Sequence, residues 1–136
     1  MASEIEYKTP ACDEETRPFW EGCGRHELVL QRCRDCGAVQ HRPRAACVSC
    51  RSDAIEYVAA SGRGKVHTYT ITQQNQAPPF RGALPYVLAY VELDEGPRLL
   101  SNVVGCEPGT VRIGMPVQVE FVDTDEQLAV PRFRPA

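Results

Sequence analysis

Four cysteines in two close pairs are the residues of this sequence whose types and spacing point most directly to chemistry. Cys33 and Cys36 form one Cys-x-x-Cys pair, and Cys47 and Cys50 form a second pair ten residues further on. Four thiolates at about 2.3 Å satisfy tetrahedral Zn²⁺ completely, so such a site leaves no position for a substrate. The spacing predicts one structural zinc ion, whose binding energy is also folding energy. The alternatives that the spacing leaves open are rubredoxin-like iron, two disulfides, or thiols without a function.

The residues after each pair set the expected turns. Gly37 follows the first pair, and glycine adopts positive φ without penalty, which favours a tight turn. Arg51 follows the second pair, so we expect that turn to be less standard.

Several arginines crowd the predicted metal site, and they have two interpretations. They compensate the net negative charge of a zinc tetrathiolate, or they form a phosphate-binding patch. The arginines concerned are Arg32, Arg34, Arg42, Arg44 and Arg51.

The other residues that could do chemistry stand alone in the sequence. A catalytic site needs a nucleophile, a base and a group that orients them, and no such combination is evident. The isolated candidates are His26, His41, His67, Cys12, Cys23 and Cys106. There is also no phosphate loop or dinucleotide fingerprint. We therefore expect the chain to be non-catalytic when alone.

Composition excludes some classes of function. The 136 residues carry a net charge of −3, which is unfavourable for a general nucleic-acid binder because such proteins neutralise phosphates. No run of 18 apolar residues predicts a membrane span, and the first residues do not resemble a signal peptide. Reduced cysteines on a metal are typical of the cytosol, so we expect a cytoplasmic protein.

The elements that must position the cysteines predict a mostly β fold. Residues 1–27 read as a loose arm followed by a short helix, with Thr16 as its cap and an end near Gly24. Residues 28–60 contain three strands, at 28–31, 39–41 and 55–59, which predict a three-stranded zinc ribbon. Residues 61–136 contain five strands, at 65–72, 86–93, 99–104, 117–121 and 128–133, which predict a five-stranded OB-fold barrel.

Two of the barrel strands carry specific expectations. In the strand at 65–72, alternation places Val66, Thr68 and Thr70 on one face. His67, Tyr69 and Ile71 are expected on the other face. The strand at 86–93 is apolar on both faces, as expected for a strand that is covered on both sides.

Exposed aromatic and basic residues are the candidates for binding. Phe19 and Trp20 on the short helix are either a hydrophobic plug against the ribbon or anchors for a partner. The long connection at 73–85 contains Phe80 and Arg81, and OB barrels commonly bind ligands with the loop between their first two strands. This connection is therefore either a contact loop or an idle mobile one.

Several short segments occur in a specific order from about residue 16 to the C-terminus. They are Pro18-Phe19-Trp20-Glu21, Leu30-Gln31-Arg32-Cys33-x-x-Cys36-Gly37, Pro43-Arg44, Cys47-x-x-Cys50, Ser61-Gly62-Arg63-Gly64, Pro85-Tyr86-Val87, Val91-Glu92-Leu93-Asp94-Glu95-Gly96-Pro97-Arg98-Leu99-Leu100 and Gly114-Met115-Pro116-Val117. This order closely resembles the acyl-CoA-associated zinc-ribbon plus OB-fold family, long filed as a domain of unknown function. Gly22 and Gly24 depart from the longer helix that is usual there.

The resemblance implies a fold, a partner and a substrate class. It implies a rubredoxin-like ribbon and an OB barrel, with Cys33, Cys36, Cys47 and Cys50 as the zinc ligands. It further implies a hetero-oligomer with a thiolase-like enzyme that acts on acyl-CoA thioesters, as in steroid side-chain retro-aldolases or condensing thiolases.

On this basis we expect an accessory subunit with two sets of contact residues. Phe19, Trp20 and Phe80 are the expected partner contacts, and Arg42, Arg44 and Arg81 are the expected contacts to coenzyme A phosphates. The alternative is a ribbon and OB-fold module that binds nucleic acid, which would need a basic groove with stacking aromatics.

Overall fold

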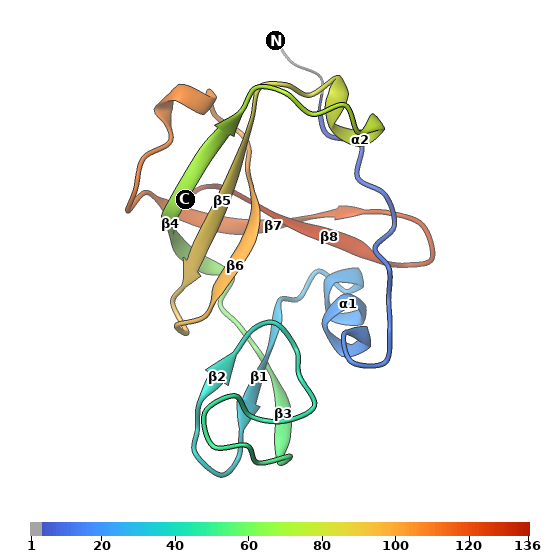
Figure 1. The fold of residues 1–136 in the computed structure, drawn as a ribbon, viewed down its shortest axis with the longest axis vertical. Helices are drawn as coiled ribbons and strands as arrows, with labels where there is room; N and C mark the ends of the chain where they lie inside the picture. Colours follow the sequence, from blue (N-terminus) through green and yellow to red (C-terminus); the bar gives the residue numbers. More distant parts are fainter. Residues whose placement is uncertain (1–3) are drawn as a thin grey trace.

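Two modules form the protein, a small three-stranded sheet and a closed barrel (Figure 1). The computed structural model describes residues 4–136. Helix α1 (Arg17–Gly24) precedes the strands of the small sheet, which are β1 (Val29–Cys33), β2 (Val39–Gln40) and β3 (Ile55–Ala59). The barrel strands are β4 (Arg63–Thr72), β5 (Tyr86–Leu93), β6 (Arg98–Val103), β7 (Pro116–Asp123) and β8 (Ala129–Pro135). The predicted fold class is confirmed.

The small sheet is the predicted ribbon. Its order is β2-β1-β3, with antiparallel pairing on both sides of β1. Strand β2 contains only two residues, so hydrogen bonds of the sheet fix little of the chain between Arg34 and Ala54. The conformation of this segment must therefore be fixed mainly by interactions of its side chains.

The barrel closes in the order β4-β5-β6-β8-β7, with β7 returning to pair with β4. Inward residues fill its interior, and Val91 and Phe133 have no exposed surface. The long connection after β4 contains the short helix α2 (Pro78–Arg81), and the three-residue 3-10 helix η1 (Pro108–Thr110) lies between β6 and β7.

The predicted alternation in β4 is wrong at one point. A bulge shifts the register between Val66 and Thr68, so His67 is an extra residue without a partner in β5. A bulge of this kind reverses the facing of the residues beyond it. Val66 therefore shares the inner face with Tyr69 and Ile71, which pack against the core.

The prediction that β5 is covered on both sides is also wrong for the chain by itself. Its inner residues, such as Val87 and Val91, are buried, but the outer face is only partly covered. Tyr90 on that outer face is 45% exposed. The apolar residues of β5 therefore lie on one face that is buried in the barrel and on one face that stays partly exposed to solvent in this chain.

The N-terminal arm is not loose over the residues that the structure describes. Ile5 is buried, and Tyr7 donates a hydrogen bond through its hydroxyl to Asn102 Oδ1 at 2.7 Å. Burial raises the pKa of Tyr7 to about 12, so this hydroxyl is a donor at neutral pH. Further along, Thr9 Oγ1 accepts the backbone N–H of Asp125 at 3.0 Å. The arm is therefore tied to the outside of the barrel (Figure 1).

Helix α1 connects the two modules through a shared core. Phe19 and Cys23 belong to the same buried cluster as Leu30 of the ribbon and Phe133 of the barrel. Thr16 precedes the helix, but its side chain hydrogen-bonds Asp13 and makes no cap, contrary to expectation. The helix is therefore held by packing and not by a capped end.

The two glycines of α1 are explained by close approach to neighbouring backbone. A Cβ on Gly24 would lie 2.1 Å from the carbonyl oxygen of Gln127, in the β7–β8 hairpin. A Cβ on Gly22 would lie 3.0 Å from the carbonyl oxygen of Glu27. A second contact, between His26 Nε2 and Asp123 Oδ1 at 2.6 Å, fastens the residues after the helix to the same hairpin. Glycine at position 24 lets α1 lie directly on the barrel, and glycine at position 22 lets the chain that follows the helix pass close beside it.

We predict that Gly24→Ala destabilises the protein by about 1–3 kcal/mol, because backbone must move to admit the methyl group. Gly109→Ala is the matched control, since a Cβ there would meet no atom within 4 Å. Urea unfolding of both variants beside the unchanged protein measures the difference. Equal midpoints for the two variants would show that the close approach does not constrain the helix.

Candidate metal centre and the ribbon–barrel groove

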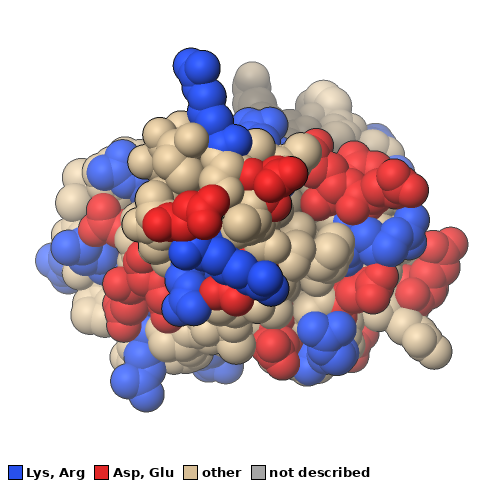
Figure 2. All heavy atoms as spheres, turned by 90° about the horizontal axis from the view of Figure 1, so that it is seen from below, with Lys and Arg blue, Asp and Glu red and all other residues tan. Residues whose placement is uncertain are grey.

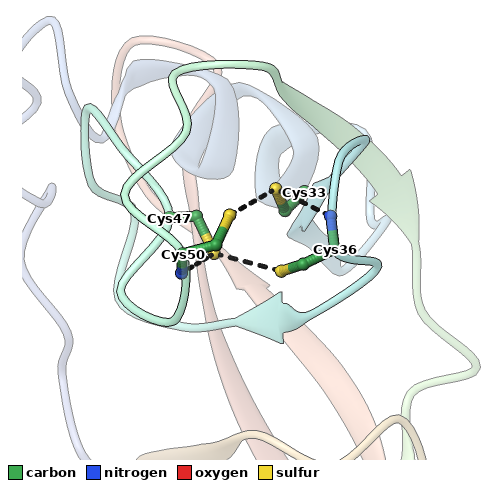
Figure 3. A group of neighbouring side chains, drawn as sticks. All are labelled: Cys33, Cys36, Cys47 and Cys50. Carbon is green, nitrogen blue, oxygen red and sulfur yellow. Dashed lines mark hydrogen bonds between the residues drawn. The ribbon is translucent and has the colours of Figure 1, made fainter.

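The four cysteine sulfurs of the ribbon converge on one point (Figure 3). They all lie within 4.8 Å of one another, and the Cys33–Cys50 and Cys36–Cys47 sulfur pairs are each 3.6 Å apart. Sulfurs bound at about 2.3 Å around a tetrahedral ion are separated by about 3.8 Å. All four are free thiols. The donors and spacing fit one tetrahedral metal ion and leave no ligand position open.

The two turns that carry the sulfurs have the same backbone arrangement. Gly37 N–H donates to the carbonyl of Cys33, and Arg51 N–H donates to the carbonyl of Cys47, both at 2.9 Å. Gly37 has φ of 77° and Arg51 has φ of 67°. The expectation that the second turn is less standard is therefore wrong. Arg51 adopts the left-handed conformation that glycine adopts in the first turn, at some cost in backbone energy.

Backbone N–H groups of these turns also point at the sulfurs. Ser49 and Cys50 donate to Cys47 Sγ at 3.3 and 3.4 Å, and Cys36 donates to Cys33 Sγ at 3.5 Å. The N–H groups of Cys50 and Ser49 lower the pKa of Cys47 to about 6. These backbone donors thus favour the thiolate form of Cys47, which is the form that metal binding requires.

A buried pair of glutamines supports the segment between the two turns, and sequence reasoning missed it. Gln40 Nε2 donates to Gln31 Oε1 at 2.7 Å, and both side chains are nearly inaccessible. Gln31 also binds the N–H and the carbonyl of Arg44, while Gln40 accepts the N–H of Val48 at 2.9 Å. The only indication of this pair in the sequence was that Gln31 and Gln40 are polar residues at positions of the strands that face inward.

The arginines around the site do not form one cluster. Arg32 and Arg34 both pair with Glu56, at 2.6 and 3.4 Å. Arg42 and Arg44 lie on the other side of the ribbon, where neither forms an ion pair within residues 4–136. The structure therefore separates a paired set of arginines from an unpaired set.

Arg42 and Arg44 line a groove of about 480 Å³ between the ribbon, α1 and the barrel. We call it the ribbon–barrel groove. Its other principal lining residues are Trp20, His41, Tyr90 and Arg98. Burial, followed by the charge of Arg42, lowers the pKa of His41 to about 4, so this imidazole is neutral at pH 7. The positive charge of the groove therefore comes from arginines.

The other candidate residues lie in different environments. Phe19 is 4% exposed and packs in the core, 5.0 Å from the ring of His41, so it is a hydrophobic plug and not a free anchor. Trp20 is half-buried at the groove. Phe80 and Arg81 lie on α2, at the opposite end of the barrel from the ribbon (Figure 1), and Phe80 packs on Tyr86 at 5.1 Å. Arg81 consequently does not join Arg42 and Arg44.

The isolated histidines and cysteines form no catalytic group in the described part of the chain. Cys23 has no exposed surface, and burial raises the pKa of its thiol to about 12, which makes it unreactive. Within residues 4–136, the four ribbon cysteines are the only metal-ligand cluster.

Charged side chains are mixed on the face seen from the ribbon end of the molecule. Figure 2 shows Lys and Arg interspersed with Asp and Glu there, with no broad area of one sign. Among the described helices, none has the length and apolar character needed to cross a membrane.

Comparisons with known proteins agree with this architecture. Residues 20–56 match the family model of the ChsH2 rubredoxin-like zinc ribbon domain, and residues 57–122 match that of the ChsH2 C-terminal OB-fold domain. The solved structure of the Ltp2-ChsH2(DUF35) aldolase contains a similar chain, with a TM-score of 0.84 and 38% identity over 93% of this chain and 98% of that one.

Three curated relatives have informative names. A DUF35 domain-containing scaffold protein of Methanocaldococcus jannaschii is 40% identical over 71% of this chain and 69% of its own length. The 3-oxo-4,17-pregnadiene-20-carboxyl-CoA hydratase alpha subunit of Mycobacterium tuberculosis is 40% identical over 84% of this chain. Subunit BbsA of the Geobacter metallireducens benzoylsuccinyl-CoA thiolase is 35% identical over 54% of this chain and 48% of its own. The chain spans well under half of the hydratase alpha subunits that it matches, 36% in the mycobacterial case.

We predict that the purified protein contains one zinc ion per chain, bound by Cys33, Cys36, Cys47 and Cys50. Metal analysis measures it, and the Cys47→Ser variant is expected to lose the ion and the ordered ribbon, since structural zinc contributes roughly 10–16 kcal/mol to folding. Cys106→Ser is the control and should keep both. Iron with a red colour, or folded protein without metal, would contradict the zinc prediction.

Proposed function

This chain belongs to the DUF35 family, and from that premise we propose that it is a non-catalytic subunit that binds and stabilises a thiolase-like enzyme acting on acyl-CoA thioesters. Its zinc would be structural, because four cysteine ligands leave the ion no free position. Nucleophile, acid and base would then all belong to the partner.

The match to the chain of the Ltp2-ChsH2(DUF35) aldolase carries this proposal. It extends over nearly the whole of both chains at 38% identity, so the ribbon and the barrel are related as one unit. The scaffold protein of Methanocaldococcus jannaschii supports a role without chemistry of its own.

Two reaction classes are candidates for the partner. The aldolase structure favours retro-aldol cleavage, and the name of the pregnadiene-carboxyl-CoA hydratase subunit favours a steroid acyl-CoA as the substrate. The benzoylsuccinyl-CoA thiolase subunit favours a thiolase reaction instead. We favour the retro-aldol assembly, because the aldolase match covers far more of this chain.

Acyl-CoA is proposed to lie at or near the interface, with its phosphates at the ribbon–barrel groove. Arg42 and Arg44 line this groove and form no ion pair within residues 4–136, and a guanidinium group can bind two phosphate oxygens at once. Gln31 fixes the backbone of Arg44 on both sides, which reduces the entropy lost on binding. Arg81 is too remote from the groove to belong to the same phosphate site.

We predict that the chain forms a stable complex when co-expressed with a thiolase-like enzyme encoded beside it. The expected results are co-elution on gel filtration and acyl-CoA cleavage or condensation that is lost without this chain. A partner that is equally soluble and active alone, with no complex eluting, would refute the scaffold role.

The alternative of a nucleic-acid module has little support from charge. Acidic residues outnumber basic residues from residue 66 onwards, and binding of single strands requires a basic track beside the stacking aromatics. We predict no appreciable binding of single-stranded DNA or RNA at physiological salt. Fluorescence anisotropy tests this, and micromolar affinity with a steep salt dependence would favour the alternative.

A further inference from the structure

The outer face of the barrel carries a continuous aromatic and aliphatic strip that joins α2 to the ribbon–barrel groove. Tyr86, Leu88 and Tyr90 alternate on the outer face of β5, and Leu100 of β6 pairs directly with Tyr90. Phe80 of α2 packs on Tyr86 at one end, and Tyr90 and Leu100 line the groove at the other. We call these five residues the barrel strip.

The strip is accessible in spite of its apolar character. Leu100 is 51% exposed and Tyr90 is 45% exposed, and both are among the most exposed large apolar side chains of the described residues. The N-terminal arm covers the neighbouring outer position, Asn102, through Tyr7, so that Asn102 is only 6% exposed. The chain therefore covers the adjacent outer surface and leaves the strip open.

The strip is also free of charge along its length. The outer positions of β4 beside it are Thr68 and Thr70, which pair with Tyr90 and Leu88. Glu92 lies at the end of β5 on this face, where Lys65 and Arg98 approach it at 3.4 and 3.7 Å. A neutral strip of this kind complements an apolar protein surface and offers a phosphate backbone no counter-charge.

The α2 end of the strip carries a positively charged side chain, that of Arg81. Arg81 follows Phe80, is exposed, and forms no ion pair within residues 4–136. At the other end the groove contributes Arg42 and Arg44. The surface that best complements this arrangement has an apolar centre and a carboxylate placed to meet Arg81.

We propose that the barrel strip is the docking surface for the thiolase-like partner, whose contacting surface is apolar with a carboxylate opposite Arg81. This inference rests on the proposed function and adds the face on which the partner is bound. The strip extends from Phe80 on α2 to the groove that Trp20 lines, so one partner surface could contact both of these residues. Aromatic residues at the centre of such a face are typical anchors of protein interfaces.

The test compares charge insertions on and off the strip, in the full chain co-expressed with its partner. Leu100→Glu is expected to weaken the complex at least about tenfold, because it places an unpaired charge in the apolar centre. Ile113→Glu is the matched control, since Ile113 is an aliphatic side chain that is 70% exposed and lies off the strip. It should change the affinity less than twofold, and unfolding curves establish that both variants are folded.

A second comparison tests the proposed carboxylate. Arg81→Glu should weaken the complex, whereas Arg112→Glu, at another exposed arginine, should not. Loss of the complex with Ile113→Glu but not with Leu100→Glu would overturn the strip while leaving the scaffold role intact. The proposal would also be overturned if the isolated chain formed a dimer, or bound single-stranded DNA, and if Leu100→Glu abolished that association. If the unchanged chain forms no complex, both the scaffold role and the docking surface that rests on it are refuted.

Discussion

The convergence of four sulfurs is the constraint on which the ribbon depends. Strand β2 is only two residues long, and the segment between Arg34 and Ala54 otherwise has few backbone hydrogen bonds to the sheet. The four sulfurs lie within 4.8 Å of one another, which places the two turns face to face and so defines the path of the chain on both sides. Because this part has little apolar core, we expect metal coordination by the four cysteines to supply the stability that burial supplies elsewhere.

The buried glutamine pair extends this constraint to the groove. Gln31 and Gln40 satisfy one another and also bind the backbone of Arg44 and Val48, so one network holds the groove edge and the second turn. Fully satisfied polar groups of low accessibility specify a single arrangement, because each broken bond would leave an unpaired group behind. The backbone of Arg44 is therefore linked through this network to the turn that carries Cys47 and Cys50.

The barrel is tied to the ribbon by packing and by a close backbone approach. Phe19, Leu30 and Phe133 share one core, and Gly24 lets α1 approach the β7–β8 hairpin. The ribbon–barrel groove exists because these contacts fix the two modules side by side. The open barrel strip begins at that groove, so a partner bound there would contact both modules together.

The sequence by itself predicted the strands, the four cysteines that cluster in the ribbon and the family, because spacing and alternation are local properties of the chain. For Phe19 the sequence alone could not decide between a core position and an interface position, because an aromatic residue is typical of both and only its neighbours distinguish them. The facing of Val66 depended on a bulge, and the left-handed conformation of Arg51 depended on the turn in which its N–H donates to the carbonyl of Cys47. The roles of Gln31 and Gln40, and the separation of Arg81 from Arg42, were decided only by the tertiary structure. Each depends on contacts between residues distant in sequence, which no local pattern encodes.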